Sequence, residues 1–166
     1  MRSSSLGLAL VAFAVACGSS DNSMQYTLAT SVGDLVVADA YAPAPAAPDV
    51  GSLYFTVINQ GSQPETLLVV ETSAGGTASL HEMTHVDGAM RMSPTGPFSI
   101  APSDTLRMAP GGYHVMIEQI SSRPVVGDTL DVALTFSHTG RIELRVPVLT
   151  YTEVARLLEG PGDHDH

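Results

Sequence analysis

The sequence is poor in several residue types that common functions require. It has no lysine and a single cysteine, and charged residues make up only 14% of its 166 positions. One cysteine excludes an intramolecular disulfide framework and any metal site built from several thiolates. Seven arginines against 17 acidic residues give a net charge of −10, which argues against the basic face that a nucleic-acid-binding protein needs. The 44% of hydrophobic residues is enough for one compact core, and the length fits a single domain.

The N-terminus predicts export from the cytoplasm. Arg2 precedes a short apolar run, Leu6 to Ala16, which is too short to span a bilayer and instead indicates a signal peptide over residues 1–16. Small residues before Cys17 and a Gly/Ser spacer after it resemble a bacterial lipoprotein signal. This resemblance implies lipidation of Cys17, a flexible tether over residues 17–24 and anchoring to a membrane. The alternative is a soluble exported protein, cleaved at the Ala-x-Ala sequence just before a free cysteine. In both cases we expect a periplasmic or cell-envelope protein.

The rest of the sequence predicts an all-β domain over residues 25–150. Short β-branched runs alternate with Gly, Pro, Asn and Asp at a spacing typical of an antiparallel β-sandwich or barrel. No later stretch is apolar for long enough to form a transmembrane helix. The segment Ala42–Asp49 is rich in Pro and is expected to be a stiff loop. One short helix, Thr152–Leu158, is expected in a C-terminal tail over residues 151–166. The expected strands are Gln25–Thr30, Leu35–Tyr41, Ser52–Asn59, Glu65–Val70, Ser79–Thr84, Ala89–Met92, Ser99–Ile100, Thr105–Met108, His114–Gln119, Thr129–Phe136 and Arg141–Val148.

Methionine and histidine concentrate in one window, His81 to Met116. It holds five of the seven Met and three of the six His residues. Because residues i and i+2 of a strand share a face, three pairs in the window can each point two side chains the same way. These pairs are His81 with Met83, Met90 with Met92, and His114 with Met116. Imidazole and thioether together form a soft ligand set that suits Cu(I) and is poor for Mg, Ca or Mn. The window therefore predicts a Cu(I) site, although zinc bound through the His residues alone remains open.

Isolated Met and His residues need a separate interpretation. Methionine often fills gaps in a core, and Met108 is expected to do so. Alternation places His85 on the face of His81, but His85 also lies near the expected strand end beside Asp87. His138 is expected in a solvated turn and not at a metal site.

The spacing of the window resembles that of a known family. Ten residues separate His81 from Met92, twenty-one separate Met92 from His114, and one separates His114 from Met116. This pattern resembles the H-x10-M-x21-H-x-M motif of the PCu(A)C family, the periplasmic copper chaperones that supply the CuA site of cytochrome c oxidase. The similarity covers about residues 25–150. Neighbouring segments agree with it, namely Tyr54–Gly61, Leu80–Glu82 and Pro110–Met116.

The resemblance implies a fold, a ligand set and a function. The fold would be a cupredoxin-like β-sandwich or barrel of the Greek-key type, binding one Cu(I). The implied ligands are His81, Met92, His114 and Met116. The function would be copper delivery, without chemistry on a substrate, to an oxidase subunit that carries CuA or to another copper chaperone. We expect the chain to act as a monomer.

Further residues are implied to support this site. Met83 and Met90 would be secondary or alternate ligands, and Pro110-Gly111-Gly112 would be the turn that aims His114 and Met116. His85 is also a candidate for a secondary metal site.

The C-terminal end carries a second group of metal-ligand residues. His164 and His166, with the neighbouring Asp163 and Asp165, could bind Cu(II) or zinc through nitrogen and oxygen. A solvated chain end with no metal role is the alternative.

Other functions were compatible with parts of this pattern. A copper-sequestering or resistance lipoprotein needs the same ligands but no acceptor, and an exported β-sandwich could use its Met residues for packing alone. A blue-copper electron carrier needs a thiolate ligand, and Cys17 lies far from the window. The segment His81–His85 has the letters of the His-Glu-x-x-His protease motif, but that motif requires a helix and this segment runs into the Asp87-Gly88 turn. We therefore predict a binding protein and not an enzyme.

Overall fold

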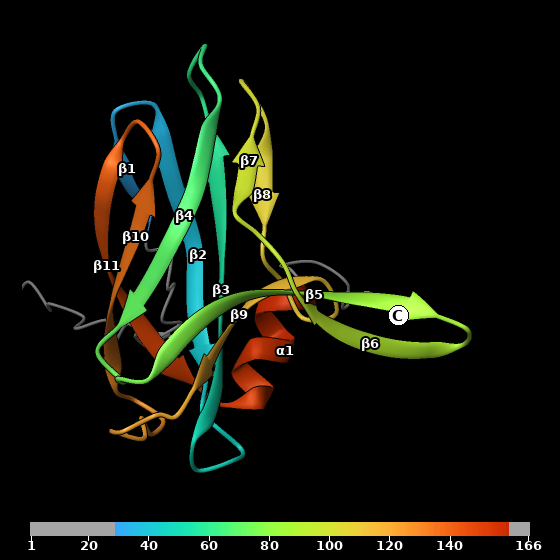
Figure 1. The fold of residues 1–166 in the computed structure, drawn as a ribbon. Helices are drawn as coiled ribbons and strands as arrows, with labels where there is room; N and C mark the ends of the chain where they lie inside the picture. Colours follow the sequence, from blue (N-terminus) through green and yellow to red (C-terminus); the bar gives the residue numbers. More distant parts are fainter. Residues whose placement is uncertain (1–28, 160–166) are drawn as a thin grey trace, which may run out of the picture.

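The computed structural model describes residues 29–159, which form a curled sheet of eleven strands followed by one helix (Figure 1). The elements are β1 (Thr30–Val32), β2 (Leu35–Pro43), β3 (Val50–Asn59), β4 (Glu65–Thr72), β5 (Thr77–Val86), β6 (Ala89–Pro94), β7 (Phe98–Ile100), β8 (Thr105–Arg107), β9 (Tyr113–Glu118), β10 (Thr129–Phe136), β11 (Gly140–Leu149) and α1 (Tyr151–Glu159). The signal peptide, Cys17, most of the tether and the C-terminal His164 and His166 lie outside the described residues.

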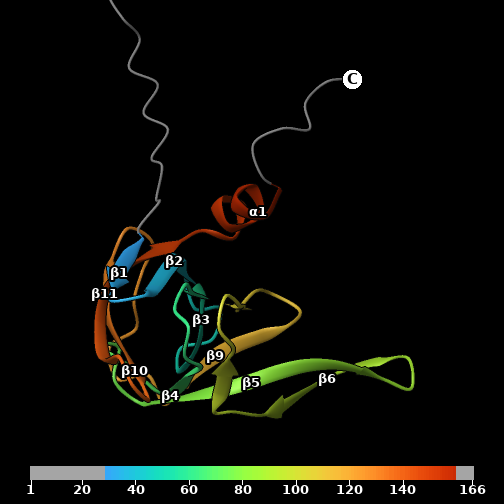
Figure 2. The same ribbon diagram turned by 90° about the horizontal axis from the view of Figure 1, so that it is seen from above.

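The sheet curls back on itself. Its strand order is β6-β5-β9-β3-β2-β11-β10-β4-β7, with β1 added to β2 and β8 added to β3. Seen from above, β4, β10 and β11 lie on one side of the molecule and β3 and β9 on the other (Figure 2). Among the described strands the pairings are antiparallel except where Val148 and Leu149 of β11 run parallel to Ala42 and Pro43 of β2. This parallel contact joins an early strand to the last one.

Alternation along the strands places the core inside the curl. On β3, Leu53, Phe55 and Val57 are each at most 1% exposed, as period-two burial requires. Met108 packs in the same cluster with 2% of its surface exposed. This burial confirms the prediction that Met108 is a packing residue.

The hairpin of β5 and β6 extends away from this body (Figure 1). The inner part of β5, Thr77 to Glu82, pairs with β9, and from His81 to Val86 β5 pairs with β6. Beyond Glu82, β5 and β6 therefore have no partner among the described strands except each other. Asp87 and Gly88 close the turn with φ angles of 52° and 80°, in the left-handed region that Asp and Gly accept most readily.

The expected strands agree with the structure apart from a few ends. The expected strand Gln25–Thr30 lies mostly outside the described residues, and the first described strand begins at Thr30. The expected loop Ala42–Asp49 was wrong for its first two residues, because β2 continues through Pro43. A proline is tolerated at this strand end, where the next residue, Ala44, donates its N–H to the Leu149 carbonyl at 2.9 Å.

The helix α1 begins with a capping box. The Thr150 hydroxyl accepts from the Glu153 N–H at 3.1 Å, and the Glu153 carboxylate accepts from the Thr150 N–H at 2.7 Å. These contacts satisfy donors that a helix start would otherwise leave free, and the hydrogen bonds from Thr150 lower the pKa of Glu153. Val154 then packs against Tyr41 and Leu149. At nine residues, this one helix of residues 29–159 is too short to cross a bilayer.

Candidate metal-binding face

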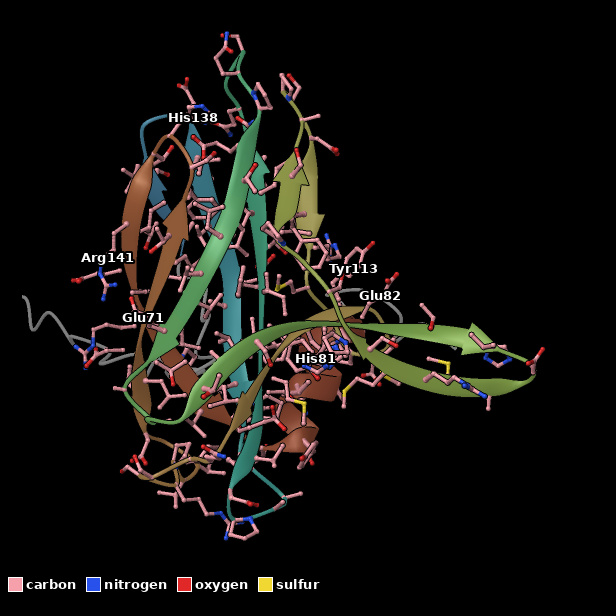
Figure 3. All side chains as sticks on the ribbon, viewed as in Figure 1. Glu71, His81, Glu82, Tyr113, His138 and Arg141 are labelled. Carbon is pink, nitrogen blue, oxygen red and sulfur yellow. The ribbon has the colours of Figure 1, made fainter. Side chains whose placement is uncertain are left out.

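Two histidines form the centre of the predicted site. His81 on β5 and His114 on β9 are direct cross-strand partners, with ring centroids 5.8 Å apart. Their chain neighbours Leu80 and Val115 pack in or against the core, so alternation turns both imidazoles to the opposite face of the sheet. Both residues are buried, at 8% and 6% exposed. Figure 3 places His81 at the base of the projecting hairpin.

A backbone carbonyl fixes the orientation of His114. The His114 Nδ1–H donates to the Gly112 carbonyl at 3.0 Å, and because a carbonyl only accepts, Nδ1 must carry the hydrogen. In the neutral ring Nε2 then holds a free lone pair. This Nε2 lies 3.2 Å from the sulfur of Met92. The same carbonyl accepts the Met83 N–H at 3.2 Å, so the turn that contains Gly112 holds β5 and aims His114 together.

His81 has one nitrogen in use and one without a partner. Its Nε2 lies 3.0 Å from the Ser79 hydroxyl, whereas its Nδ1 is buried and has no hydrogen-bond partner. A buried polar atom left unsatisfied typically costs about 1–3 kcal/mol. With Nε2–H donating to Ser79, Nδ1 carries a lone pair that no hydrogen bond uses, and this is the donor that a soft metal ion requires from an imidazole.

The two predicted methionine ligands flank this pair. Met92 on β6 is 47% exposed and faces Met83 across the hairpin. Met116 is half-buried and pairs with Ser79 of β5 and Ser52 of β3. It lies on the same face as His114, one alternation further along β9, or about 7 Å. The structure thus brings His81, His114 and Met92 into a cluster and places Met116 at its border.

Two neighbours of the site were not identified from the sequence. Ser79 holds His81, and Tyr54 stands beside His114 with ring centroids 6.4 Å apart. Burial raises the pKa of Tyr54, and burial raises that of the adjacent Tyr41 to about 12, so both hydroxyls stay neutral at ordinary pH. Ser79 lies two residues before His81, so alternation alone could have placed it on this face.

The outer hairpin continues the same face with further soft side chains. Met83 pairs with Met92, and His85 pairs with Met90, with 3.4 Å between His85 Nδ1 and the Met90 sulfur. His85 is therefore inside β5, which extends one residue further, to Val86. The expected strand end at Thr84 was two residues too early.

The remaining predicted residues lie away from this face. His138 is in a turn, with its side chain 69% exposed and its Nδ1 3.5 Å from the Glu65 carboxylate, as expected for a solvated position. Within residues 29–159 no three His, Cys, Asp or Glu side chains gather as a metal-binding group. On this face, the candidate ligands that accompany the imidazoles of His81, His85 and His114 are the methionine thioethers.

Glu65 holds the turn that contains His138. Its carboxylate accepts the N–H groups of His138 and Thr139 at 3.3 and 2.9 Å and the Thr139 hydroxyl at 3.2 Å. Burial alone would raise the pKa of Glu65, but these hydrogen bonds together lower it. The residue was not singled out from the sequence, because its partners lie more than 70 positions away.

The sequence matches proteins described as putative lipoproteins, and the fold matches that of solved PCuAC domains. Residues 35–148 match the family model described as "Putative lipoprotein LpqE-like". A "Putative lipoprotein" of Leifsonia xyli subsp. xyli (strain CTCB07) is 31% identical over 97 residues, which are 58% of this chain and 58% of that relative. The match therefore spans less than two thirds of the relative's length.

Solved structures of PCuAC domains share the fold. The copper-bound PCuAC domain of PmoF2 has a TM-score of 0.62 and 22% identity, covering 74% of this chain and 98% of that one. The apo PCuAC domain of PmoF1 has a TM-score of 0.63 and 23% identity, covering 74% and 99%. The Cu(I) form of DR1885 from Deinococcus radiodurans has a TM-score of 0.56 and 24% identity, covering 74% and 81%.

These matches confirm the predicted cupredoxin-like β-fold and the resemblance to PCu(A)C domains. The family model spans most of the described strands, from the start of β2 to nearly the end of β11. The chain therefore belongs to the LpqE-like family, and its domain has the fold of the PCuAC domains.

Proposed function

We propose that this protein is an exported copper chaperone that carries one Cu(I) on the ligands His81, Met92, His114 and Met116. The observation that supports this most directly is the pairing of His114 Nε2 with the Met92 sulfur at 3.2 Å, beside the unpartnered Nδ1 of His81. Free imidazole nitrogen and thioether sulfur are the donors that Cu(I) prefers.

The proposed site combines fixed and accessible ligands. His81 and His114 are buried and held by Ser79 and Gly112, so they bind copper without first being ordered. Met92 is about half exposed, so an incoming ligand from an acceptor protein can reach the copper beside it. Transfer then replaces one ligand by another, with no change in the oxidation state and no reaction on a substrate.

The acceptor in this proposal is an oxidase subunit carrying CuA or a further copper chaperone. Cys17 would be lipidated and would hold the domain at the outer face of a membrane. Support for this location comes from the LpqE-like family and from the Leifsonia relative, both described as putative lipoproteins.

Competition with a Cu(I)-selective chelator tests the site. We expect His114→Ala to weaken Cu(I) binding by at least about tenfold, because a ligand with a prepared lone pair is lost, which corresponds to about 1.4 kcal/mol. His138→Ala is the matched control and should leave the affinity unchanged, since His138 lies in an exposed turn. Equal effects of the two changes would show that the site is elsewhere.

Mixing the copper-loaded protein with an apo CuA domain tests the transfer. Copper should appear in the acceptor domain, and metal analysis of the two proteins after their separation reports it without any change in the oxidation state of the copper. If Cu(I) binds tightly but never leaves for this domain or another chaperone, sequestration describes the protein better than delivery.

A further inference from the structure

The soft side chains of the β5–β6 hairpin extend well beyond the four proposed ligands. His85 faces Met90 near the tip, and Met83 faces Met92 further in. Residues two apart on each strand share a face, so all four side chains lie on the face that carries His81. Figure 3 shows sulfur atoms along the projecting hairpin.

Packing in the core does not account for Met90 and Met92. Met108 is 2% exposed and belongs to the core, whereas Met90 and Met92 are 51% and 47% exposed. The hairpin has no partner strand beyond Glu82 except its own two strands. Met90 therefore contributes little buried area to the stability of the fold, and its sulfur is open to solvent.

His85 and Met90 already have the geometry of a ligand pair. Nδ1 of His85 lies 3.4 Å from the sulfur of Met90, similar to the 3.2 Å between His114 Nε2 and Met92. The hairpin thus repeats, at its exposed end, the nitrogen–sulfur contact of the inner site. Met83 lies two positions before His85 and can supply a second sulfur.

We propose that the outer half of the hairpin holds a second Cu(I) site, formed by His85, Met90 and Met83, through which copper enters the inner site. This inference rests on the proposed function, since the inner site is where the copper goes. Cross-strand pairs that share a face of the hairpin are two residues apart, or about 7 Å. Met83 of the outer site faces Met92 of the inner site across the hairpin, so copper can pass inward by exchange of one thioether for another, with no electron transferred.

The outer site should bind more weakly than the inner one. His85 is exposed, and for His85 the structure records no hydrogen bond to a backbone carbonyl like the one that orients His114. A ligand that must be ordered on binding costs affinity. An entry site needs this property, because copper has to leave it for the inner site.

Counting bound Cu(I) tests the outer site. The reference protein is the full chain with His164→Asn and His166→Asn, which removes the terminal histidines as a source of extra copper. Titration with Cu(I) against graded chelators should show two equivalents, a tight one and a weaker one. The double change His85→Ala and Met90→Leu should remove only the weaker equivalent. Arg91→Leu is the matched control, because Arg91 lies between Met90 and Met92 but on the other face, and it should keep both equivalents.

The outcomes separate this inference from the proposed function. A single equivalent in the reference protein, lost in His114→Ala, would overturn the outer site and leave the inner one intact. No bound Cu(I) at all would overturn both. Two equivalents that survive the double change would also place the second copper elsewhere.

The rate of copper loading tests separately whether the outer site is the entry point. Stopped-flow mixing with a weak Cu(I)–chelator complex should load the inner site several-fold more slowly in the His85→Ala, Met90→Leu protein than in Arg91→Leu. Equal loading rates in the two variants would overturn the route.

Discussion

His114 illustrates how a single backbone carbonyl can set the chemistry of a side chain. The Gly112 carbonyl accepts the Nδ1–H of His114, so the nitrogen that faces Met92 is Nε2, which carries the lone pair. His138 instead shares its Nδ1 with Ser137 and Glu65 in an exposed turn. What distinguishes the two residues is therefore their hydrogen-bond partners.

Glu65 gives a prediction about stability and pH. Its pKa is lowered in the folded protein from an ordinary value of 4.5, so its contribution to stability is present above that value and is lost as the pH falls through the lowered pKa. We expect Glu65→Gln to reduce the free energy of unfolding by about 1–3 kcal/mol at neutral pH, since charge-assisted hydrogen bonds are lost. Urea unfolding at neutral and strongly acidic pH measures this, and the difference from the unchanged protein should shrink in acid.

The control for Glu65 is another carboxylate on the same strand. Glu71 pairs with Arg141, but both side chains are more than half exposed. Figure 3 shows the two residues at the surface of the sheet. Exposed ion pairs contribute about 0–1 kcal/mol, so Glu71→Gln should change stability little. A loss as large as that for Glu65→Gln would contradict the role given to the buried carboxylate.

At the scale of elements, the hairpin and the strand β9 together build the site. β5 begins just after Gly76, where the backbone passes close to the end of β9. A Cβ atom at Gly76 would lie 2.1 Å from the Glu118 carbonyl oxygen, far inside contact distance. The close approach of these backbones sets the register that places His81 opposite His114.

The close contact at Gly76 predicts that alanine destabilises the protein by different amounts at two glycines that both have a positive φ. Gly76 has φ 79° and meets backbone, whereas Gly111 has φ 82° and has no atom within 4 Å of an added Cβ. Gly111→Ala should cost about 1 kcal/mol for the left-handed conformation alone. Gly76→Ala should cost clearly more, because β5 or β9 must move.

Thermal unfolding and Cu(I) affinity measure the two variants. A larger fall in the midpoint for Gly76→Ala, together with weaker copper binding, is the expected result. Equal destabilisation by the two substitutions would mean that the contact with Glu118 is relieved without cost.

At the scale of the whole molecule, some methionine sulfur atoms are buried in the core and others are exposed on the hairpin of β5 and β6. Met108 is enclosed by the core, while Met90 and Met92 are open to solvent on the hairpin. A thioether converted to a sulfoxide becomes polar and offers oxygen in place of soft sulfur. Exposure therefore decides which methionines an oxidant reaches first.

Mild peroxide treatment should separate copper binding from folding. We expect Met90 and Met92 to be oxidised before Met108, and Cu(I) binding to be lost while circular dichroism still shows the folded sheet. Peptide mass spectrometry gives the order of oxidation. Undiminished copper affinity after oxidation of Met92 would point to a site made of histidine alone.

The sequence predicted which side chains share a face of the sheet better than it predicted which residues contact one another. Period-two alternation located the strands and put His81, Met83, His114 and Met116 on shared faces, because side-chain direction is a local property. The partner of a strand is not local: the parallel contact of β2 with β11 and the carboxylate of Glu65 depend on residues far apart in the chain. The sequence also did not show which ring nitrogen of His114 faces Met92, since that depends on the backbone path of the turn at Gly112.

The projecting hairpin means that the proposed ligands are not all supported in the same way. His81 and His114 belong to strands paired within the main sheet, whereas Met92 lies on β6, an edge strand supported by β5 alone. Bending of the hairpin therefore changes the distance from Met92 to His114 and leaves the distance between the two histidines nearly constant. A partner protein that binds the far end of the hairpin and bends it therefore moves the sulfur of Met92 relative to the two histidines.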